Sequence, residues 1–169
     1  MKISDHELII LNILKVRSPL QSIEVSSPRV DWNDYPESIR LSLLSLIELP
    51  TVTHLNINSF TRFPATALSG CAKLSNLQFG DLDLTLPDSE SNHVISRCKI
   101  PTPALLDIRR GTHGFATLLP SLHALAGGPI DFSRVQIAIF QVDSQGFIDD
   151  INKLIKVTRQ LQYIYIKSE

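Results

Sequence analysis

The sequence predicts an α/β fold in which about six irregular strand–helix units follow one another along 169 residues. Short leucine-rich segments recur along the chain, and segments with a helical spacing of apolar residues lie between them. The residues that alternate with the leucines are mostly polar, which is typical of a sheet with one exposed face. We therefore expect a parallel sheet whose strands are linked by helices.

The recurring segment is clearest at residues 74–84, LSNLQFGDLDL. Its apolar residues follow the spacing L-x-x-L-x-L-x-x-(N/C)-x-L, which is the strand segment of a leucine-rich repeat. Leu77 and Phe79 are two residues apart, so on a strand they point to the same side. We expect five side chains of this unit to face the core: Leu74, Leu77, Phe79, Leu82 and Leu84.

Similar segments occur at five other places in the chain. LQSIEV, VTHLNI and LQYIYI keep the spacing well, whereas PALLDI and VQIAIFQV keep it less well. The first residues of the six segments are 32, 22, 29, 32 and 26 residues apart, in or slightly above the range of 20–29 for leucine-rich repeats. In VQIAIFQV we assign Ala138, Phe140 and Val142 to the core, although Ile137 and Ile139 are equally apolar on the other face. The series predicts a leucine-rich-repeat-like solenoid.

The first linking helix is expected over residues 35–49. Asp34 is its expected N-cap and Pro50 its expected stop. The helix presents one apolar stripe: Ile39, Leu43, Leu46 and Ile47.

Four further helices are expected. They cover residues 5–16, a short stretch from Pro64 to near Gly70, residues 89–98, and residues 147–160. The last of them carries its apolar residues on one face: Ile148, Ile151, Leu154 and Ile155.

A compact doubly wound α/β domain is the alternative architecture, because it also alternates strands with helices. Its strands are apolar on both faces, since helices cover the sheet from both sides. Here the positions between the leucines are mostly polar, which favours a solenoid with an open concave face. The strand at 135–142, which is apolar on both sides, is the main observation for the compact alternative.

Composition narrows the possible partners. With 16 Lys and Arg against 17 Asp and Glu, the net charge is −1, so we expect neither a nucleic acid nor a membrane as partner. Cys71 and Cys98 are too few for a disulfide framework and are expected to be free, buried thiols of a reducing compartment. We expect a cytoplasmic or nuclear protein whose residues 1–169 form a single domain.

Four stretches of the chain resemble the leucine-rich-repeat region of the F-box protein family of mushroom-forming (basidiomycete) fungi. They are SPLQSIEVSS (18–27), the long stretch from 49 to 84, KIPTPALLDI (99–108) and GGPIDFSRVQIAIFQVDS (127–144). The resemblance implies a substrate-recognition region of a cullin-RING ubiquitin ligase, working by protein binding. The family's F-box, which docks to the ligase adaptor subunit, has no counterpart here, because HELIILNIL at 6–14 is too short and runs directly into the first repeat.

The chain is therefore expected to be the recognition part of a longer family architecture, with an unknown protein substrate as partner. The ligase adaptor is a partner only if an F-box is present elsewhere. The alternative is a stand-alone structural or decoy repeat fragment without ligase function. No polar capping unit follows the last strand, so we expect its apolar end to be covered by more protein, by a partner or by a second copy.

The motifs for catalysis and for cofactors are incomplete, so we do not expect an enzyme. RRGTHGF at 109–115 lacks the glycine spacing of a phosphate-binding loop, and VDSQGFIDDIN lacks both acidic anchors of a calcium loop. The five histidines show no zinc-binding spacing. We expect no cofactor and no metal.

Binding is expected on the concave face, which consists of the residues between the leucines. A sheet holds such side chains in fixed positions, and tyrosine and arginine are frequent anchors of protein interfaces. The expected partner-binding residues are Glu24, Ser26, His54, Asn56, Asn58, Asn76, Gln78, Asp107, Arg109, Tyr163 and Tyr165.

Overall fold

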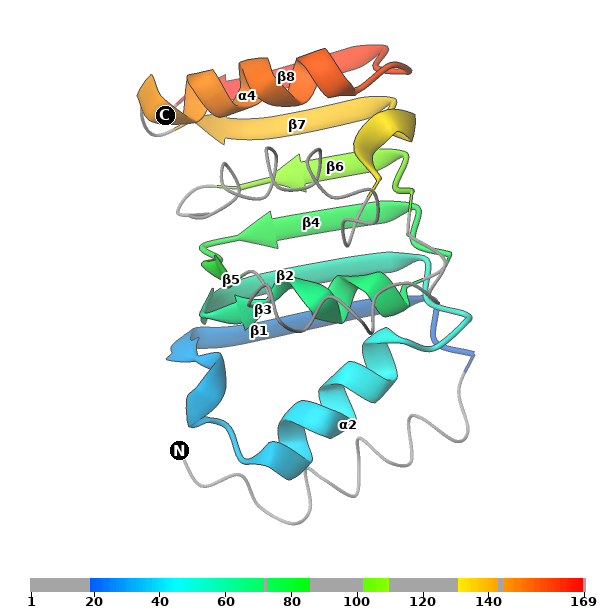
Figure 1. The fold of residues 1–169 in the computed structure, drawn as a ribbon, viewed down its shortest axis with the longest axis vertical. Helices are drawn as coiled ribbons and strands as arrows, with labels where there is room; N and C mark the ends of the chain where they lie inside the picture. Colours follow the sequence, from blue (N-terminus) through cyan, green and yellow to red (C-terminus); the bar gives the residue numbers. More distant parts are fainter. Residues whose placement is uncertain (1–18, 72, 86–101, 110–130, 143–144, 169) are drawn as a thin grey trace, which may run out of the picture.

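The computed structural model describes residues 19–71, 73–85, 102–109, 131–142 and 145–168. It confirms the α/β class and the parallel sheet: six strands pair in chain order, each parallel to the next. Figure 1 shows the strands stacked one above another, with helix α2 beside β1 at one end and α4 beside β7 and β8 at the other. The strands are β1 (Ser22–Asp31), β2 (His54–Thr61), β4 (Asn76–Gly80), β6 (Leu105–Ile108), β7 (Ile137–Val142) and β8 (Tyr163–Ser168).

The strand register aligns the expected core residues into two rows. Because successive side chains of a strand point to opposite faces, residues in register across a sheet share one face. Leu77 and Phe79, at the centre of these rows, are fully buried. The first row is Ile23, Leu55, Leu77, Leu106, Ala138 and Ile164, and the second is Val25, Ile57, Phe79, Ile108, Phe140 and Ile166.

All five apolar residues expected to be core in LSNLQFGDLDL are buried. Leu77 and Phe79 lie on β4, whereas Leu82 and Leu84 lie beyond it. Leu84 belongs to β5 (Leu84–Thr85), which pairs in parallel with β3 (Phe63–Pro64) in a second, two-stranded sheet. The buried residues of this segment therefore continue past the end of β4.

The predicted register of β7 is also confirmed for its described side chains. Ala138 and Phe140 are buried in the core, and Ile137 and Ile139 lie half-buried on the opposite face. Leu106 and Ala138 are register partners, which continues the core row across β6 and β7.

Helix α2 (Glu37–Ile47) occupies the predicted place, but its predicted N-cap is wrong. Pro36 holds the N-cap position, whereas Asp34 ends a short 3₁₀ helix, η1 (Trp32–Asp34). Asp31 caps η1 by accepting a hydrogen bond from the Asn33 backbone N–H at 2.8 Å. The chain makes this extra turn because it buries the Trp32 ring before the helix begins.

Trp32 belongs to an aromatic cluster beneath the ends of β1 and β2. Its ring lies 4.9 Å from the ring of Phe63 and 6.0 Å from that of Phe60, both in edge-on geometry. Tyr35 completes the cluster, and its hydroxyl lies 2.7 Å from Ser27 Oγ, within hydrogen-bond distance. The cluster attaches the segment before α2 to the sheet.

Two further 3₁₀ helices lie in the part of the chain that the structure describes. The short helix expected from Pro64 is η2 (Ala65–Gly70), with Pro64 as its N-cap. The turn η5 (Phe132–Arg134) repeats the design of η1: Asp131 accepts from the Ser133 N–H at 2.9 Å, and the aromatic Phe132 is buried.

Helix α4 (Gln145–Val157) confirms the last predicted helix, but its predicted apolar face is only partly buried. Ile151 and Leu154 are buried, whereas Ile148 and Ile155 are each 38% exposed. The difference arises because α4 packs on β7 and η5, which cover only part of its apolar surface. A stripe of α4 therefore faces solvent in the described part of the chain.

Some sequence predictions fall outside the described residues. These are the helices over 5–16 and 89–98, most of RRGTHGF, and Cys98. The other cysteine, Cys71, is free and buried, as expected, and its Sγ lies 3.4 Å from the Ile47 carbonyl oxygen. Within the described ranges, no helix has the length and apolar character needed to cross a membrane.

Candidate functional site

The face of the main sheet opposite the core rows carries the side chains predicted to bind a partner. Register places them in rows that run across the strands, with one residue from each paired strand. The first row begins Ser22, His54, Asn76; the second begins Glu24, Asn56, Gln78, Asp107; and the third begins Ser26, Asn58, Gly80.

A shallow hollow of about 290 Å³ lies on this face over β1, β2 and β4. Six of its lining residues are polar, and the carboxylate of Glu24 and the imidazole of His54 lie on neighbouring strands. Leu105 of β6 closes the hollow on one side; the sequence prediction missed this residue because leucine at this position resembles core. The polar lining is Ser22, Glu24, His54, Asn56, Asn76 and Gln78.

The exposed imidazole of His54 is held by the residue before it. His54 Nδ1 and Thr53 Oγ1 are 2.8 Å apart, and the Thr53 hydroxyl also donates to the Gln21 carbonyl oxygen at 3.2 Å. Because this hydroxyl donates to Gln21, its oxygen is placed to accept from Nδ1–H of the Nδ1-protonated tautomer, in which Nε2 is a hydrogen-bond acceptor. The hollow thus combines an imidazole with side-chain amides.

Asn56 and Asn58 are linked along β2. Asn58 Nδ2 donates to Asn56 Oδ1 at 2.9 Å, so the two half-buried amides hold each other in position. The space that the Asn58 amide occupies exists because its register partner on β4 is Gly80. Both Asn56 amide hydrogens remain available to a partner.

Arg109 joins two strands of the face. Its Nε lies 3.5 Å from Asp107 Oδ2. With the Gln78 amide oriented so that its oxygen faces the guanidinium, Arg109 Nη1 donates to that oxygen at 3.0 Å. The predicted residues Gln78, Asp107 and Arg109 are therefore brought together. They form a small charged and amide cluster beside the hollow.

Over β7 and β8 the first two rows of the face are apolar and aromatic, whereas the third row pairs Gln141 with Lys167. Leu105 on β6 and Ile137 on β7 continue the first row to Tyr163, while Ile139 leads the second row to Tyr165. Both tyrosines are more than half exposed. The structure thus places them on the predicted face, but at the opposite end of the sheet from Glu24, with four strands between β1 and β8.

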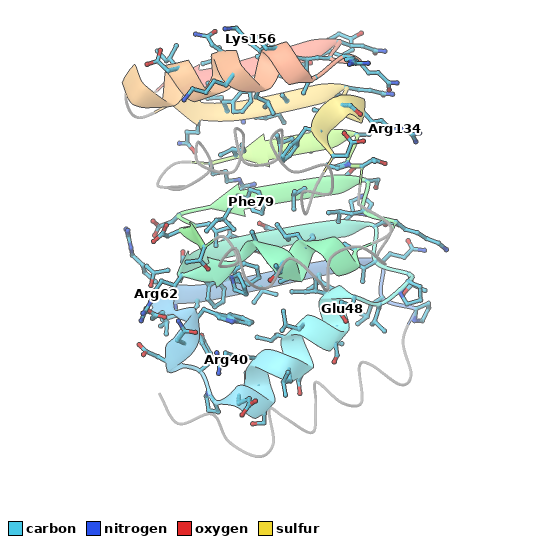
Figure 2. The ribbon with its side chains drawn as sticks, in the orientation of Figure 1. Arg40, Glu48, Arg62, Phe79, Arg134 and Lys156 are labelled. Carbon is cyan, nitrogen blue, oxygen red and sulfur yellow. The ribbon has the colours of Figure 1, made fainter. Side chains whose placement is uncertain are left out.

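A second charged group, which the sequence prediction missed, lies where β1, β2 and β4 end. Arg29 pairs with Asp81 at 3.0 Å, and Arg62 pairs with Asp31. Figure 2 shows Arg62 at the arrowhead end of the strands. Hydrogen bonding from Arg62 lowers the pKa of Asp31 below its ordinary value of 3.8. Because each partner lies about 30 or more residues from the other in sequence, short motifs could not reveal these pairs.

Three of the four charged residues at this edge have unusual backbone conformations. Arg29, Arg62 and Asp81 have positive φ angles of 36°, 55° and 46°. These conformations are uncommon for residues with a side chain. Arg62 and Asp81 directly follow the ends of β2 and β4, whereas Arg29 lies within β1 at its register irregularity. The ion pairs join these neighbouring segments.

Among the described residues, no group of three or more His, Cys, Asp or Glu is arranged to hold a metal ion. Comparisons with protein families, with characterised proteins and with solved structures found no match.

Proposed function

We propose that this chain is a protein-binding repeat module whose partner docks on the exposed face of the sheet. The observation that carries the proposal is the alignment of Glu24, Asn56, Gln78 and Asp107 in one row across four adjacent strands. A row of this kind presents hydrogen-bonding groups at the regular spacing between strands, on a support that does not need to be ordered on binding.

The architecture we propose is a leucine-rich-repeat-like solenoid. Two observations support it: the strand order follows the chain order without reversal, and the two inner rows are apolar while the outer rows over β1, β2 and β4 are polar. A doubly wound sheet reverses its strand order at a switch point and buries both faces. The apolar outer positions Ile137 and Ile139 are the feature that the compact alternative would explain.

Binding rather than catalysis is the mode of action we infer. His54 is the hollow's only imidazole in its described lining, and its Nδ1 is engaged with Thr53, next to it in the chain. Most other polar lining groups are amides, which donate and accept hydrogen bonds without a change of charge. Such a set is suited to recognising a polar segment of a protein surface.

The resemblance to fungal F-box proteins leads us to propose a substrate-recognition role connected with a ubiquitin ligase, in the cytoplasm or nucleus. The alternative role is a structural or decoy repeat without ligase function. Affinity capture of the ligase adaptor by the product of the complete gene separates the two. Capture supports the first role, and its absence in the presence of an intact fold supports the second.

The binding face itself is tested by changing His54, Asn56 and Asn76 together to alanine. We expect the fold to persist and quantitative affinity capture from native extract to lose the partners that the unchanged protein retains. The matched control changes three exposed residues of α2, namely Glu37, Ser38 and Leu41, to alanine. Equal capture by both triple variants would contradict the proposed face, and unfolding of the first variant would show that these side chains are structural.

A further inference from the structure

The two end strands of the main sheet differ in how well they are protected against further pairing. Among the described strands, β1 pairs only with β2, and β8 pairs only with β7. Exposed sheet edges invite pairing with another chain unless a bulge, proline or charge prevents it.

Strand β1 carries three such protections. Its pairing with β2 is interrupted by an irregularity between Ser26 and Val30. Pro28 lies within that interruption and has no N–H to donate, and Arg29 has a positive φ of 36°. This edge is therefore poorly suited to accept a strand over its full length.

Strand β8 has a regular register and exposed apolar residues on both faces. Ile164 and Ile166, which lie in the core rows, are 39% and 61% exposed, and Tyr163 and Tyr165 on the opposite face are 56% and 53% exposed. Lys167 is the strand's only charged residue. The segment YIYIKS combines high β-propensity with a single charge, which is typical of strands that pair with another strand.

We propose that β8 pairs antiparallel with β8 of a second copy of this chain, about a twofold axis that passes beside Tyr165. This register keeps each residue on its own face, because partners then have residue numbers that sum to an even value. Ile164 faces Ile166 of the second copy, so the two exposed core-row isoleucines cover each other. Tyr163 faces Lys167 on the outer face, a pairing of an aromatic ring with a cation.

Helix α4 fits the same symmetry. Its exposed residues Ile148 and Ile155 are seven positions apart and therefore lie on one side of the helix. Antiparallel packing of two α4 helices sets Ile148 against Ile155 and also sets the exposed Asp149 against the exposed Lys156. The charges are thus complementary in the twofold arrangement. Figure 1 shows α4 and β8 together at this end of the molecule.

The partner is a second copy in a closed pair rather than a growing chain of copies. A chain would require β8 of one copy to pair with β1 of the next, and the proline and irregularity of β1 oppose that contact. In the closed pair, the main sheets of the two molecules join edge to edge into one continuous sheet.

The first test measures the mass of the full chain, residues 1–169, by size-exclusion chromatography with light scattering across a concentration series. We expect a dimer of about 38 kDa, twice the 18.9 kDa chain mass. Ile166→Lys should raise the dissociation constant at least about 30-fold, because it places a charge against Ile164 of the other copy. The control Leu41→Lys changes an equally exposed side chain on α2, at the other end of the sheet, and should leave the dimer intact.

The second test fixes the register. Residues directly opposite in an antiparallel pair are close enough for a disulfide, so Tyr165→Cys should form a covalent dimer on mild oxidation. Tyr163→Cys should form far less, because it faces Lys167 rather than itself. The unchanged chain controls for Cys71 and Cys98. A monomer at about 100 μM, a dimer insensitive to Ile166→Lys, or equal cross-linking at 163 and 165 would overturn the proposal.

Discussion

Gly80 lies beside Asn58 in the parallel pairing of β4 with β2, and a Cβ atom at position 80 would stand 2.4 Å from Asn58 Oδ1. The glycine is thus required by a neighbouring side chain rather than by a turn. The Asn58 amide occupies the space above Gly80 and donates to Asn56, and in this way one small residue on β4 shapes the polar face on β2.

Gly80→Ala should destabilise the protein by about 1–3 kcal/mol, because the methyl group displaces the Asn58 amide and breaks its hydrogen bond to Asn56. Urea unfolding followed by circular dichroism measures the effect. In Gly80→Ala/Asn58→Ala the clash is removed, so the double variant should cost less than the sum of the single changes. Additive costs would show that Asn58 is not the group that the methyl group meets.

Leu77→Ala and Ile57→Ala should each cost about 2–5 kcal/mol of unfolding free energy, since both side chains are fully buried in the inner rows. Chemical denaturation at equilibrium measures the loss. Leu41→Ala is the matched control: this leucine is exposed on α2, so its truncation should change stability by no more than about 0.5 kcal/mol. A large loss at Leu41 would contradict its exposed position on α2.

The surface ion pair between Asp31 and Arg62 should make the free energy of unfolding decrease in acidic solution. The pKa of Asp31 is lowered in the folded protein, so the pair's contribution is fully present above the ordinary value of 3.8 and is lost as pH falls through the folded pKa. Asp31→Asn removes the charge but keeps a capping oxygen for Asn33.

The stability difference between the unchanged protein and Asp31→Asn should therefore shrink as pH falls below about 3.8. Urea unfolding at several pH values between 2 and 7 measures it. The stability difference between the unchanged protein and Arg62→Gln should shrink over the same pH range, because this variant removes the other partner of the ion pair. A difference that stays constant with pH would show that the ion pair contributes no acid dependence.

Cys71 should react slowly with alkylating reagents while the protein is folded. Burial, and then the Glu48 carboxylate, raises the pKa of its thiol to about 12 from an ordinary 9.0. The thiolate is the reactive form, so alkylation at pH 8 should be much faster in urea, as measured by peptide mass spectrometry at Cys71.

The same thiol gives an alkaline dependence of stability. Its folded pKa is raised, so its contribution is fully present below about pH 9 and declines as pH rises towards 12. Cys71→Ala should remove this part of the decline, as seen in unfolding curves between pH 8 and 11. Identical pH dependence in both proteins would contradict the buried, neutral thiol.

The inner rows could be predicted from the sequence because they obey a local rule. Leu77 and Phe79 are two residues apart, as are their register partners Leu55 and Ile57 on β2. This spacing places both residues of each pair on the same side of their strand. The same rule placed Ala138 and Phe140 correctly on β7, where Ile137 and Ile139 offered an equally apolar choice.

The errors arose where tertiary packing decided the outcome. Asp34 has the right residue type for an N-cap, but burial of Trp32 creates a separate 3₁₀ turn that Asp31 caps, and α2 begins after Pro36. Ile148 and Ile155 follow the helical period, yet too little structure lies against α4 in the described part of the chain to bury them.

The candidate face was predictable residue by residue but not as an arrangement. Spacing within a strand indicates that Asn76 and Gln78 point away from the core, and the structure agrees. The contacts between strands, such as Arg109 with Gln78 and Gly80 with Asn58, depend on a register that no single segment contains.

The arrangement of the outer rows also determines how the exposed face of the sheet could change during evolution. In the second row, β1, β2, β4 and β6 each supply one side chain, and the inner residues of these strands are separate positions. A substitution at Asn56 or Gln78 therefore alters the surface of one strand, while the packing of the inner rows beneath it stays the same. In the proposed binding module, specificity can therefore change one strand at a time, and lengthening a connection between strands leaves the order of the strands unchanged.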